Sequence, residues 1–334
     1  MNKRFEIVAL VGSLICILAV MLVYNFKMET WWDEYVFIQL SKNIPDYSAT
    51  ATWLNNMPSS VMYADIGYEN YQMIYDAPIY LHMPLAPMLM WAFTHLTSDI
   101  HILRLLTIFL SIGSVFLVYL ILRRHIGWYA VLSVVPVLLC AVLLSGAMWF
   151  YWDAFMVFFF LLTFYLMEAK PQSKWKYVTA CCLVWTKMYV GLVLLIPLVI
   201  KNRKMLYCAL SIIPFYIITV MVTGNWLYIL SHYWNAMILH NTNYDLYILP
   251  KIWSIVKTWN LAPYFVLTSG ILFMVRKYPS VVAFYLIALL YGLGTGFGSY
   301  QAAIMLYGGA LAFPLVCHHF AKKQDVEQLV EAEV

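Results

Sequence analysis

The sequence predicts an all-α membrane protein, a polytopic bundle of transmembrane helices. Of its 334 residues, 64% are hydrophobic and 11% are charged, and the mean hydropathy is +0.78. Soluble domains are about half apolar and about a quarter charged. Apolar runs long enough to cross a bilayer recur along the chain. We expect about eight full spans and one short helical hairpin, with juxtamembrane helices on the outer face.

The basic residues predict how these spans are oriented. Most of the 20 lysines and arginines fall into clusters. These clusters are Lys3/Arg4, Arg123/Arg124, Lys170/Lys174/Lys176, Lys201/Arg203/Lys204, Arg276/Lys277 and Lys322/Lys323. Cytoplasmic loops collect Lys and Arg, so the spans between consecutive clusters should come in pairs. Both termini should then be cytoplasmic.

The spans that satisfy this pairing follow in chain order. They are 5–24, 100–122, 128–146, 154–167, 205–222, 263–275, 281–297 and 302–316. The corresponding organisation is a first transmembrane helix (1–24), an outer loop (25–99), a transmembrane core (100–204), C-terminal transmembrane helices (205–320) with an outer loop at 223–262, and a cytoplasmic tail (321–334). The first span lacks a small-residue cleavage site, so we interpret it as a retained helix rather than a signal peptide.

The stretch YVTACCLVWTKMYVGLVLLIPLVI, residues 177–200, carries a single charge, Lys187. It has basic clusters at both ends, and one straight helix would invert every later loop. We therefore predict two short helices in a hairpin with its tip near Thr186 and Lys187. Irregular backbone at membrane depth is tolerated where it lines a polar cavity. An intramembrane lysine suggests function, and the alternative is a lysine that snorkels or pairs within the protein.

Two neighbouring acids follow the first span. Asp33 and Glu34 lie in the first turn of a helix expected over 31–43, which should stop before Pro45. Acidic residues also suit a helix N-terminus for purely structural reasons. Further along, the apolar stretch 82–97 is short and contains two prolines. We expect it to form an interfacial helix on the outer face.

Two further charges lie at span boundaries. Asp153, among the aromatic residues of MWFYWDAF, either caps the next helix or faces a polar cavity. Arg104, in ILRLL, either snorkels or clamps a phosphate. Together with Asp33, Glu34 and Lys187, these residues suit transfer of a sugar from a lipid-linked phosphate. A carboxylate can act as general base on an acceptor hydroxyl, and a cation can stabilise the leaving phosphate.

The outer loops are rich in aromatic residues over 63–80 and 226–247. Such residues form either interfacial belts or stacking platforms for sugar rings and prenyl chains. Asp153, His82 and His240 are candidates for positioning a substrate, and His232 and His240 are candidates for the outer wall of the site. The six cysteines fall in or beside apolar runs, so we interpret them as small apolar side chains. No cofactor is required by this chemistry, although a divalent metal is compatible with it.

The order of these motifs resembles the polytopic C-type glycosyltransferases that use polyprenyl-phosphate sugars. These include the protein O-mannosyltransferases and the bacterial aminoarabinose lipid A transferases. The matching segments, within residues 5–204, are WWDEYVFIQL, HMPLAPML, HILRLLTIFLSIGSVFLVYLILRRHIG, YWDAFMVFFFLLTFYL and WTKMYVGLVLLIPLVI. The sequence departs from the family at His82-Met83-Pro84, where relatives have further prolines.

The resemblance implies roles for these residues. Asp33 corresponds to the first-loop catalytic acid and Glu34 to its neighbour, while Asp153 corresponds to the second-loop acid. Lys187 corresponds to the lysine that approaches the donor phosphate, and Arg104 to the arginine of an Arg-Leu pair. The implied activity is transfer, with inversion, of a sugar from a polyprenyl-phosphate donor to a lipid, glycan or protein acceptor on the outer face of the cell membrane. The implied partners include no nucleic acid.

Two other functions fit the intramembrane charges. A lipid-linked sugar flippase would also place them at membrane depth. The absence of an internal repeat argues against it, and the Gly-rich stretch YGLGTGFGSY (291–300) is the nearest candidate for a broken helix. The third possibility is a scaffold subunit with a decayed site. The presence of Asp33, Glu34, Asp153 and Lys187 together argues against that.

Overall fold

The described chain is helical throughout its regular elements. The structure, a computed structural model, describes residues 3–28, 34, 38, 41–42, 85–148, 152–223, 226, 257, 261–294 and 303–332. The N-terminal half contains α1 (Lys3–Lys27), α6 (Leu85–Leu96), α7 (Ile100–Ile126), η1 (Gly127–Ser133), α8 (Val134–Leu139), α9 (Ala141–Gly146) and α10 (Trp152–Ala169). The C-terminal half contains α11 (Trp175–Thr186), α12 (Met188–Lys201), η2 (Arg203–Ile212), α13 (Ile213–Thr223), α16 (Ala262–Thr268), η3 (Ser269–Met274), α17 (Pro279–Gly294) and α19 (Ile304–Ala332).

Several of these helices suit a bilayer. Four stretches are long and apolar enough to cross one: Arg4–Lys27, Ile100–Leu139, Trp152–Ala169 and Ile304–Gln324. Apolar side chains of α1 are widely exposed, and only 17% of its most apolar window is buried. A hydrophobic helix with so little protein cover is suited to a lipid environment. The prediction of an all-α membrane protein is confirmed at this level, whereas the number of spans stays a prediction.

Some predicted helices are not single straight elements. The stretch 128–146 is divided into η1, α8 and α9. Its 3₁₀ segment gives way to α-helix just before Pro136, which lies in the first turn of α8. Proline is tolerated at this position because the N–H groups of the first helical turn have no intrahelical partner. The stretches 205–222 and 263–275 likewise each combine a 3₁₀ segment with an α-helix.

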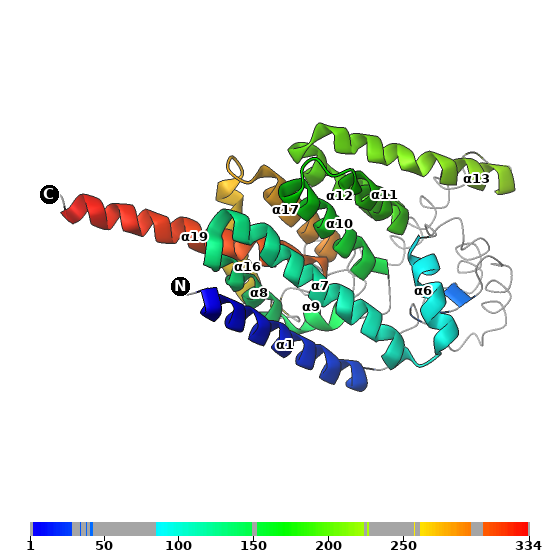
Figure 1. Cartoon of the computed structure of the whole chain (residues 1–334), viewed down its shortest axis with the longest axis horizontal. Helices are drawn as coiled ribbons and strands as arrows, with labels where there is room; N and C mark the ends of the chain where they lie inside the picture. The colour runs from blue at the N-terminus through cyan, green and yellow to red at the C-terminus, as the bar shows by residue number, and fades with distance from the viewer. Residues whose placement is uncertain are drawn as a thin grey trace.

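One helix runs through the predicted boundary between the last span and the tail, and the boundary itself stays a prediction. The long helix α19 continues from Ile304 to Ala332, past the expected start of the tail at 321. Its last part, AKKQDVEQLVEA, is rich in alanine, lysine, glutamate, glutamine and leucine, all of which favour helix. In Figure 1 this end projects beyond the other helices, on the same side of the bundle as the N-terminus.

The predicted hairpin is present. Between α11 and α12, Lys187 adopts an extended conformation (φ −150°, ψ 96°) that ends one helix and precedes the next. The two helices pack closely just beyond this tip, and α11 also lies against α10 (Figure 1). A Cβ placed on Gly191 would lie 2.7 Å from the carbonyl oxygen of Leu183 and 2.9 Å from Cα of Val184. Glycine at 191 therefore permits the close approach of the two helices.

The basic clusters gather at one end of the helical bundle, which we call the basic end. Near the start of α1, Glu6 binds Arg123 (Nε to Oε1, 2.9 Å) and accepts a hydrogen bond from Tyr119 (2.7 Å). At the C-terminal end of α10, Glu168 pairs with Lys201 and lies 3.4 Å from Nε2 of His125. These contacts bring the start of α1 and the ends of α7, α10 and α12 together.

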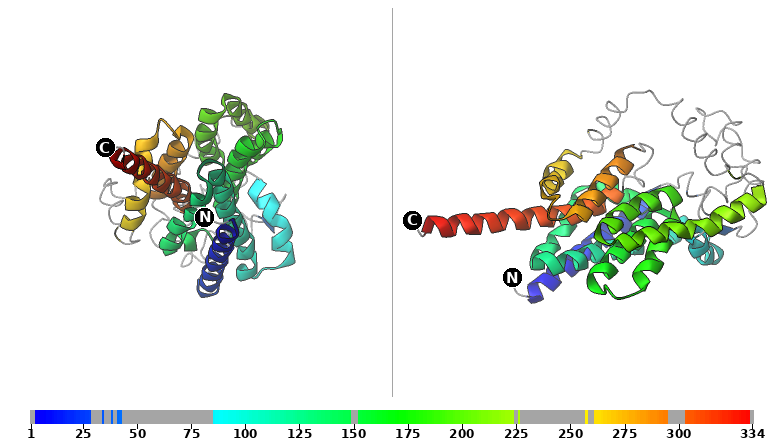
Figure 2. Two further views of the ribbon diagram at one scale, coloured as in Figure 1. Left: turned by 60° about the vertical axis from the view of Figure 1, so that its left-hand side comes forward. Right: turned by 90° about the horizontal axis from the view of Figure 1, so that it is seen from above.

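The Arg276/Lys277 and Lys322/Lys323 clusters join the same end through His318 of α19. Its ring lies 5.3 Å from that of Tyr129, just after α7. Lys277 and Lys322 both lie within electrostatic range of His318. This gathering is the arrangement that the predicted topology requires. In Figure 2 the two chain termini again lie at one end of the bundle.

We predict that Gly191→Ala loosens the hairpin. The added methyl group would meet backbone atoms, which cannot rotate away, so the free energy of unfolding should fall by about 1–3 kcal/mol. Gly12→Ala is the matched control, because a Cβ at Gly12 in α1 has no neighbouring atom within 4 Å. Thermal unfolding of both variants in one detergent measures the difference. Equal stability of the two variants would contradict the close helix approach.

Candidate functional site

The first of two buried ion pairs lies at the hairpin tip. The Nζ atom of Lys187 is 3.2 Å from Oδ2 and 3.4 Å from Oδ1 of Asp153. Lys187 also donates a 2.6 Å hydrogen bond to the hydroxyl of Tyr291, which in turn donates one of 2.9 Å to Asp153. The side chains of Lys187 and Asp153 are 7% and 8% exposed. The three polar groups therefore form a closed triangle inside the protein.

The elements around this triangle explain why a charge is tolerated there. Lys187 comes from the break between α11 and α12, Asp153 from the first turn of α10, and Tyr291 from α17. The ammonium also lies 5.3 Å from the ring centroids of both Trp152 and Tyr291. A carboxylate, a hydroxyl and two aromatic faces replace much of the water that the ammonium loses on burial.

Sequence reasoning missed Tyr291. Its position was noted only as the first residue of the Gly-rich stretch 291–300, which was considered as a possible broken helix. Nothing local distinguishes this residue from the other tyrosines among the 26 in the chain. Its partners lie 104 and 138 positions away in the sequence. Such a pairing requires the fold to be known.

The second ion pair joins Arg104 of α7 to Glu34. Nε of Arg104 donates to Oε1 (2.8 Å) and Nη2 donates to Oε2 (2.5 Å), so the contact is bidentate. Both side chains are fully buried. Nη1 donates to the carbonyl oxygens of Met28 (3.1 Å) and Asn25 (3.4 Å) at the end of α1. The planar guanidinium thus fixes Glu34 against two helices.

Hydrogen bonds along α7 relate the second pair to the first. One turn beyond Arg104, Thr107 donates to the carbonyl oxygen of Met148. Ser111 donates to that of Ala147 at 2.9 Å. These carbonyls shortly precede Asp153 in the chain. Since the C-terminal ends of α7 and α10 meet at the basic end, the two ion pairs lie toward the opposite end of these helices.

The structure groups the predicted site residues into two pairs. Lys187 is with Asp153, and Arg104 is with Glu34. Arg104 does not snorkel, because its side chain is fully buried and its donors bind Glu34 and the backbone carbonyls of Asn25 and Met28. The other predicted site residues lie outside the described residues: Asp33, His82, His232 and His240.

Metal ligands and thiols offer no second centre in the described part of the chain. There, no group of three or more His, Cys, Asp or Glu side chains is placed to hold a metal ion. All six cysteines are described, and all are free. The buried charged side chains of the described residues include all four members of the two ion pairs.

Comparisons of the chain with protein-family models, curated proteins and solved structures gave no significant match. The chemistry of the site therefore has to be argued from its own residues. A buried ammonium held by one carboxylate and one hydroxyl can exchange part of this contact for an anionic ligand. Phosphate oxygens are suitable ligands, because they accept charge-assisted hydrogen bonds from an ammonium.

We predict that the two arginine–glutamate pairs differ sharply in their contribution to stability. Arg104→Met leaves the buried carboxylate of Glu34 uncompensated and should lower the free energy of unfolding by about 3–5 kcal/mol. Arg123→Met breaks the pair with Glu6, in which the arginine is 38% exposed and the carboxylate keeps its hydrogen bond from Tyr119, so it should cost clearly less. Denaturant unfolding in detergent measures both effects.

A double variant separates two causes of lower stability, which are an uncompensated buried charge and lost side-chain packing. Glu34→Leu combined with Arg104→Met removes both charges, and it should be more stable than Arg104→Met alone. If the double variant is as unstable as Arg104→Met, the loss comes from the shape of the arginine side chain rather than from the stranded carboxylate.

Proposed function

We propose that this protein is an integral membrane glycosyltransferase. It moves a sugar from a polyprenyl-phosphate donor to an acceptor hydroxyl on the outer face of the cell membrane, with inversion at the anomeric carbon. The observation that carries the proposal is the Lys187–Asp153–Tyr291 triangle, a buried cation at a break between two apolar helices. The distance between this triangle and the basic end of the bundle also supports the proposal.

The topology is part of the proposal. Basic residues favour the cytoplasmic side of a membrane, so the basic end is assigned to the cytoplasm together with both termini. Lys201 at the far end of α12 belongs to the basic end, whereas Lys187 precedes the first residue of that helix. A helix of this length separates the two by roughly 20 Å. Lys187 is thereby assigned to the outer half of the membrane.

The proposed reaction is a direct displacement. A carboxylate, assigned to Asp33, removes the proton from the acceptor hydroxyl, and the acceptor oxygen forms a bond to the anomeric carbon. The bond between that carbon and the phosphate oxygen breaks, and its electron pair leaves with the phosphate. The donor is a phosphodiester with one negative charge, and the leaving monoester gains a second because its pKa is about 6.

The Lys187–Asp153–Tyr291 triangle is suited to stabilise this additional negative charge on the leaving phosphate. An ammonium beside the phosphate interacts more strongly with the departing monoester than with the donor, so it lowers the barrier rather than only aiding binding. The proposal assigns this task to Lys187. Asp153 and Tyr291 hold the ammonium in place before the donor arrives. No cofactor is required for these steps.

The ion pair between Arg104 and Glu34 is suited to positioning a side chain rather than to binding the donor phosphate. Because Arg104 directs its donors to Glu34 and backbone carbonyls, the proposal now assigns it to hold Glu34 rather than the donor phosphate. Asp33 is the residue directly before Glu34 in the chain. A Glu34 held rigidly by a bidentate contact is suited to orienting its neighbour or the acceptor. His82 and His240 remain candidates for substrate positioning because of their places within or beside the predicted outer loops.

We predict loss of transfer in variants of the base and of the ammonium. Asp33→Asn should lower the rate about 10²–10⁴-fold, and Lys187→Ala should lower it about 10²–10³-fold. The assay uses purified protein in lipid vesicles with a radiolabelled polyprenyl-phosphate sugar and a crude extract of lipid and protein acceptors. The labelled product identifies the acceptor class.

Two controls match these changes. Lys201→Ala removes another paired lysine from the basic end of α12, and Asp99→Asn changes an N-cap whose side chain accepts from the amide of His101. Both should transfer sugar at near wild-type rates. Transfer that survives in Lys187→Ala and Asp33→Asn would disprove the assigned roles. If the donor crosses vesicle membranes in a Lys187-dependent way without any transfer, the protein is instead a transporter.

We also predict a role for the Tyr291 hydroxyl. Tyr291→Phe keeps the ring but removes two hydrogen bonds to charged groups, so the rate should fall about 10-fold or more. Tyr119→Phe is the control, since Tyr119 likewise donates to a carboxylate, that of Glu6 at the basic end. An equal effect of the two substitutions on turnover would show that Tyr291 acts through stability alone.

A further inference from the structure

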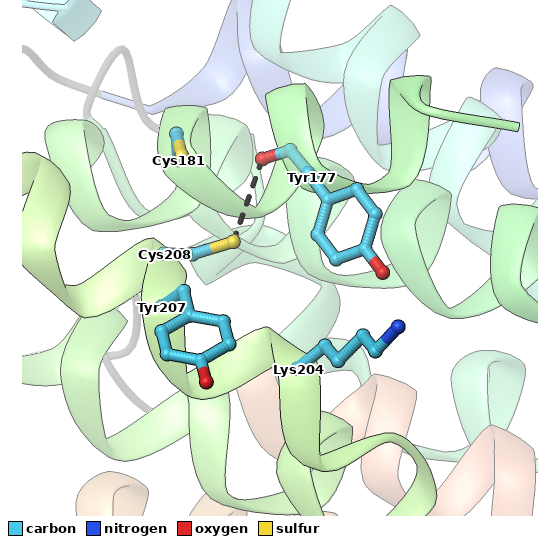
Figure 3. A pocket seen from close by; sticks show the side chains of 5 residues that line it. All are labelled: Tyr177, Cys181, Lys204, Tyr207 and Cys208. Carbon is cyan, nitrogen blue, oxygen red and sulfur yellow. Dashed lines mark hydrogen bonds between the residues drawn. The ribbon is translucent and has the colours of Figure 1, made fainter.

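A pocket on another surface of the bundle lies between α11 and η2. Its volume is about 280 Å³, and it is lined by Tyr177, Cys181, Lys204, Tyr207 and Cys208. Figure 3 shows the ring of Tyr177 coming from α11, and the ring of Tyr207 and the side chain of Lys204 coming from η2. The two thiols lie at the opposite end of the pocket from the Lys204 amino group.

The far wall of the pocket is held in place by contacts between the two helices. The thiol of Cys208 donates to the carbonyl oxygen of Tyr177 at 3.7 Å. Further along, the indole N–H of Trp185 donates to the carbonyl oxygen of Ser211 at 2.8 Å. The pocket is therefore a fixed feature of the α11–η2 contact, with apolar walls and a polar mouth.

Positive charge marks this mouth. Lys204 is exposed and forms no salt bridge with any acidic side chain in the described ranges. In contrast, the charge of Lys201 is satisfied by Glu168. An anion at the mouth would meet Lys204 directly.

The surface that continues from the mouth is apolar. Leu206, Tyr207 and Leu210 of η2 are 60%, 70% and 58% exposed. Ile213, Ile217 and Met221 extend this exposed row along α13, at a spacing of three or four residues. The row begins directly after Arg203 and Lys204. A change from exposed cations to an exposed apolar row is the pattern of a helix that passes from the headgroup region into hydrocarbon.

We propose that this pocket binds the headgroup of an anionic phospholipid. The amino group of Lys204 contacts the lipid phosphate, and the hydroxyls of Tyr177 and Tyr207 are available as further donors at the headgroup. The apolar pocket wall takes the glycerol ester region, and the acyl chains lie along the exposed row of η2 and α13. The site is separate from the Lys187 triangle and does not depend on the proposed sugar transfer.

The test uses a photoactivatable phosphatidylglycerol in nanodiscs of phosphatidylcholine that contain the full-length protein. Crosslinks are mapped to peptides by mass spectrometry. We expect label on the peptides that contain Tyr177 and Tyr207, and unlabelled phosphatidylglycerol should remove it. Lys204→Gln should require about fivefold more phosphatidylglycerol for the same labelling, because one basic residue near an anionic lipid contributes about that factor.

Two variants and two competitors control the result. Lys204→Arg keeps the charge and should label like the wild type, which excludes misfolding as the cause of the loss. Lys277→Gln removes another exposed lysine of the basic end and should also label normally. Equal competition by phosphatidylcholine would reduce the site to general lipid contact and overturn the proposal. Competition by soluble glycerol phosphate alone would overturn it in favour of a free phosphate ligand, as would the absence of label from both peptides.

Discussion

The burial of the Lys187 ammonium is the constraint on which the centre of this structure depends. An ionised lysine away from water costs several kcal/mol unless a carboxylate and hydrogen-bonding groups accompany it. Here Asp153 arrives from α10 and Tyr291 from α17, so three segments far apart in the sequence must meet at one point. The packing of α11 against α10 and of α12 against α17 is consistent with this requirement (Figure 1).

The features that sequence reasoning found are those with a local cause. The hairpin follows from basic residues at both ends of 177–200, and its tip at Lys187 follows from the single charge inside that run. The helical class follows from apolar runs of spanning length. In each case the prediction uses the hydropathy or the charge of one short stretch, and it does not require knowledge of a partner elsewhere in the chain.

The features that sequence reasoning did not find depend on partners far apart in the chain or on local breaks in the helical backbone. Arg104 could be expected to snorkel or to bind phosphate, but its partner Glu34 lies 70 positions away. Tyr291 was overlooked for the same reason. The division of 128–146 into short helices was hidden by an apolar composition that fits a straight span equally well, with Pro136 as the one local sign of change. The assignments of Asp33, His82 and His240 stay predictions.

The break at Lys187 also has a consequence for biosynthesis. During synthesis, α11 and α12 reach the insertion machinery as one apolar run, before Lys187 at the tip can pair with Asp153 or Tyr291. The insertion machinery then has little except flanking charge to distinguish a re-entrant hairpin from a span. Lys170, Lys174 and Lys176 precede the run, and Lys201, Arg203 and Lys204 follow it. In the proposed topology both groups stay on one side of the membrane, and their position during synthesis would set the orientation of every later helix.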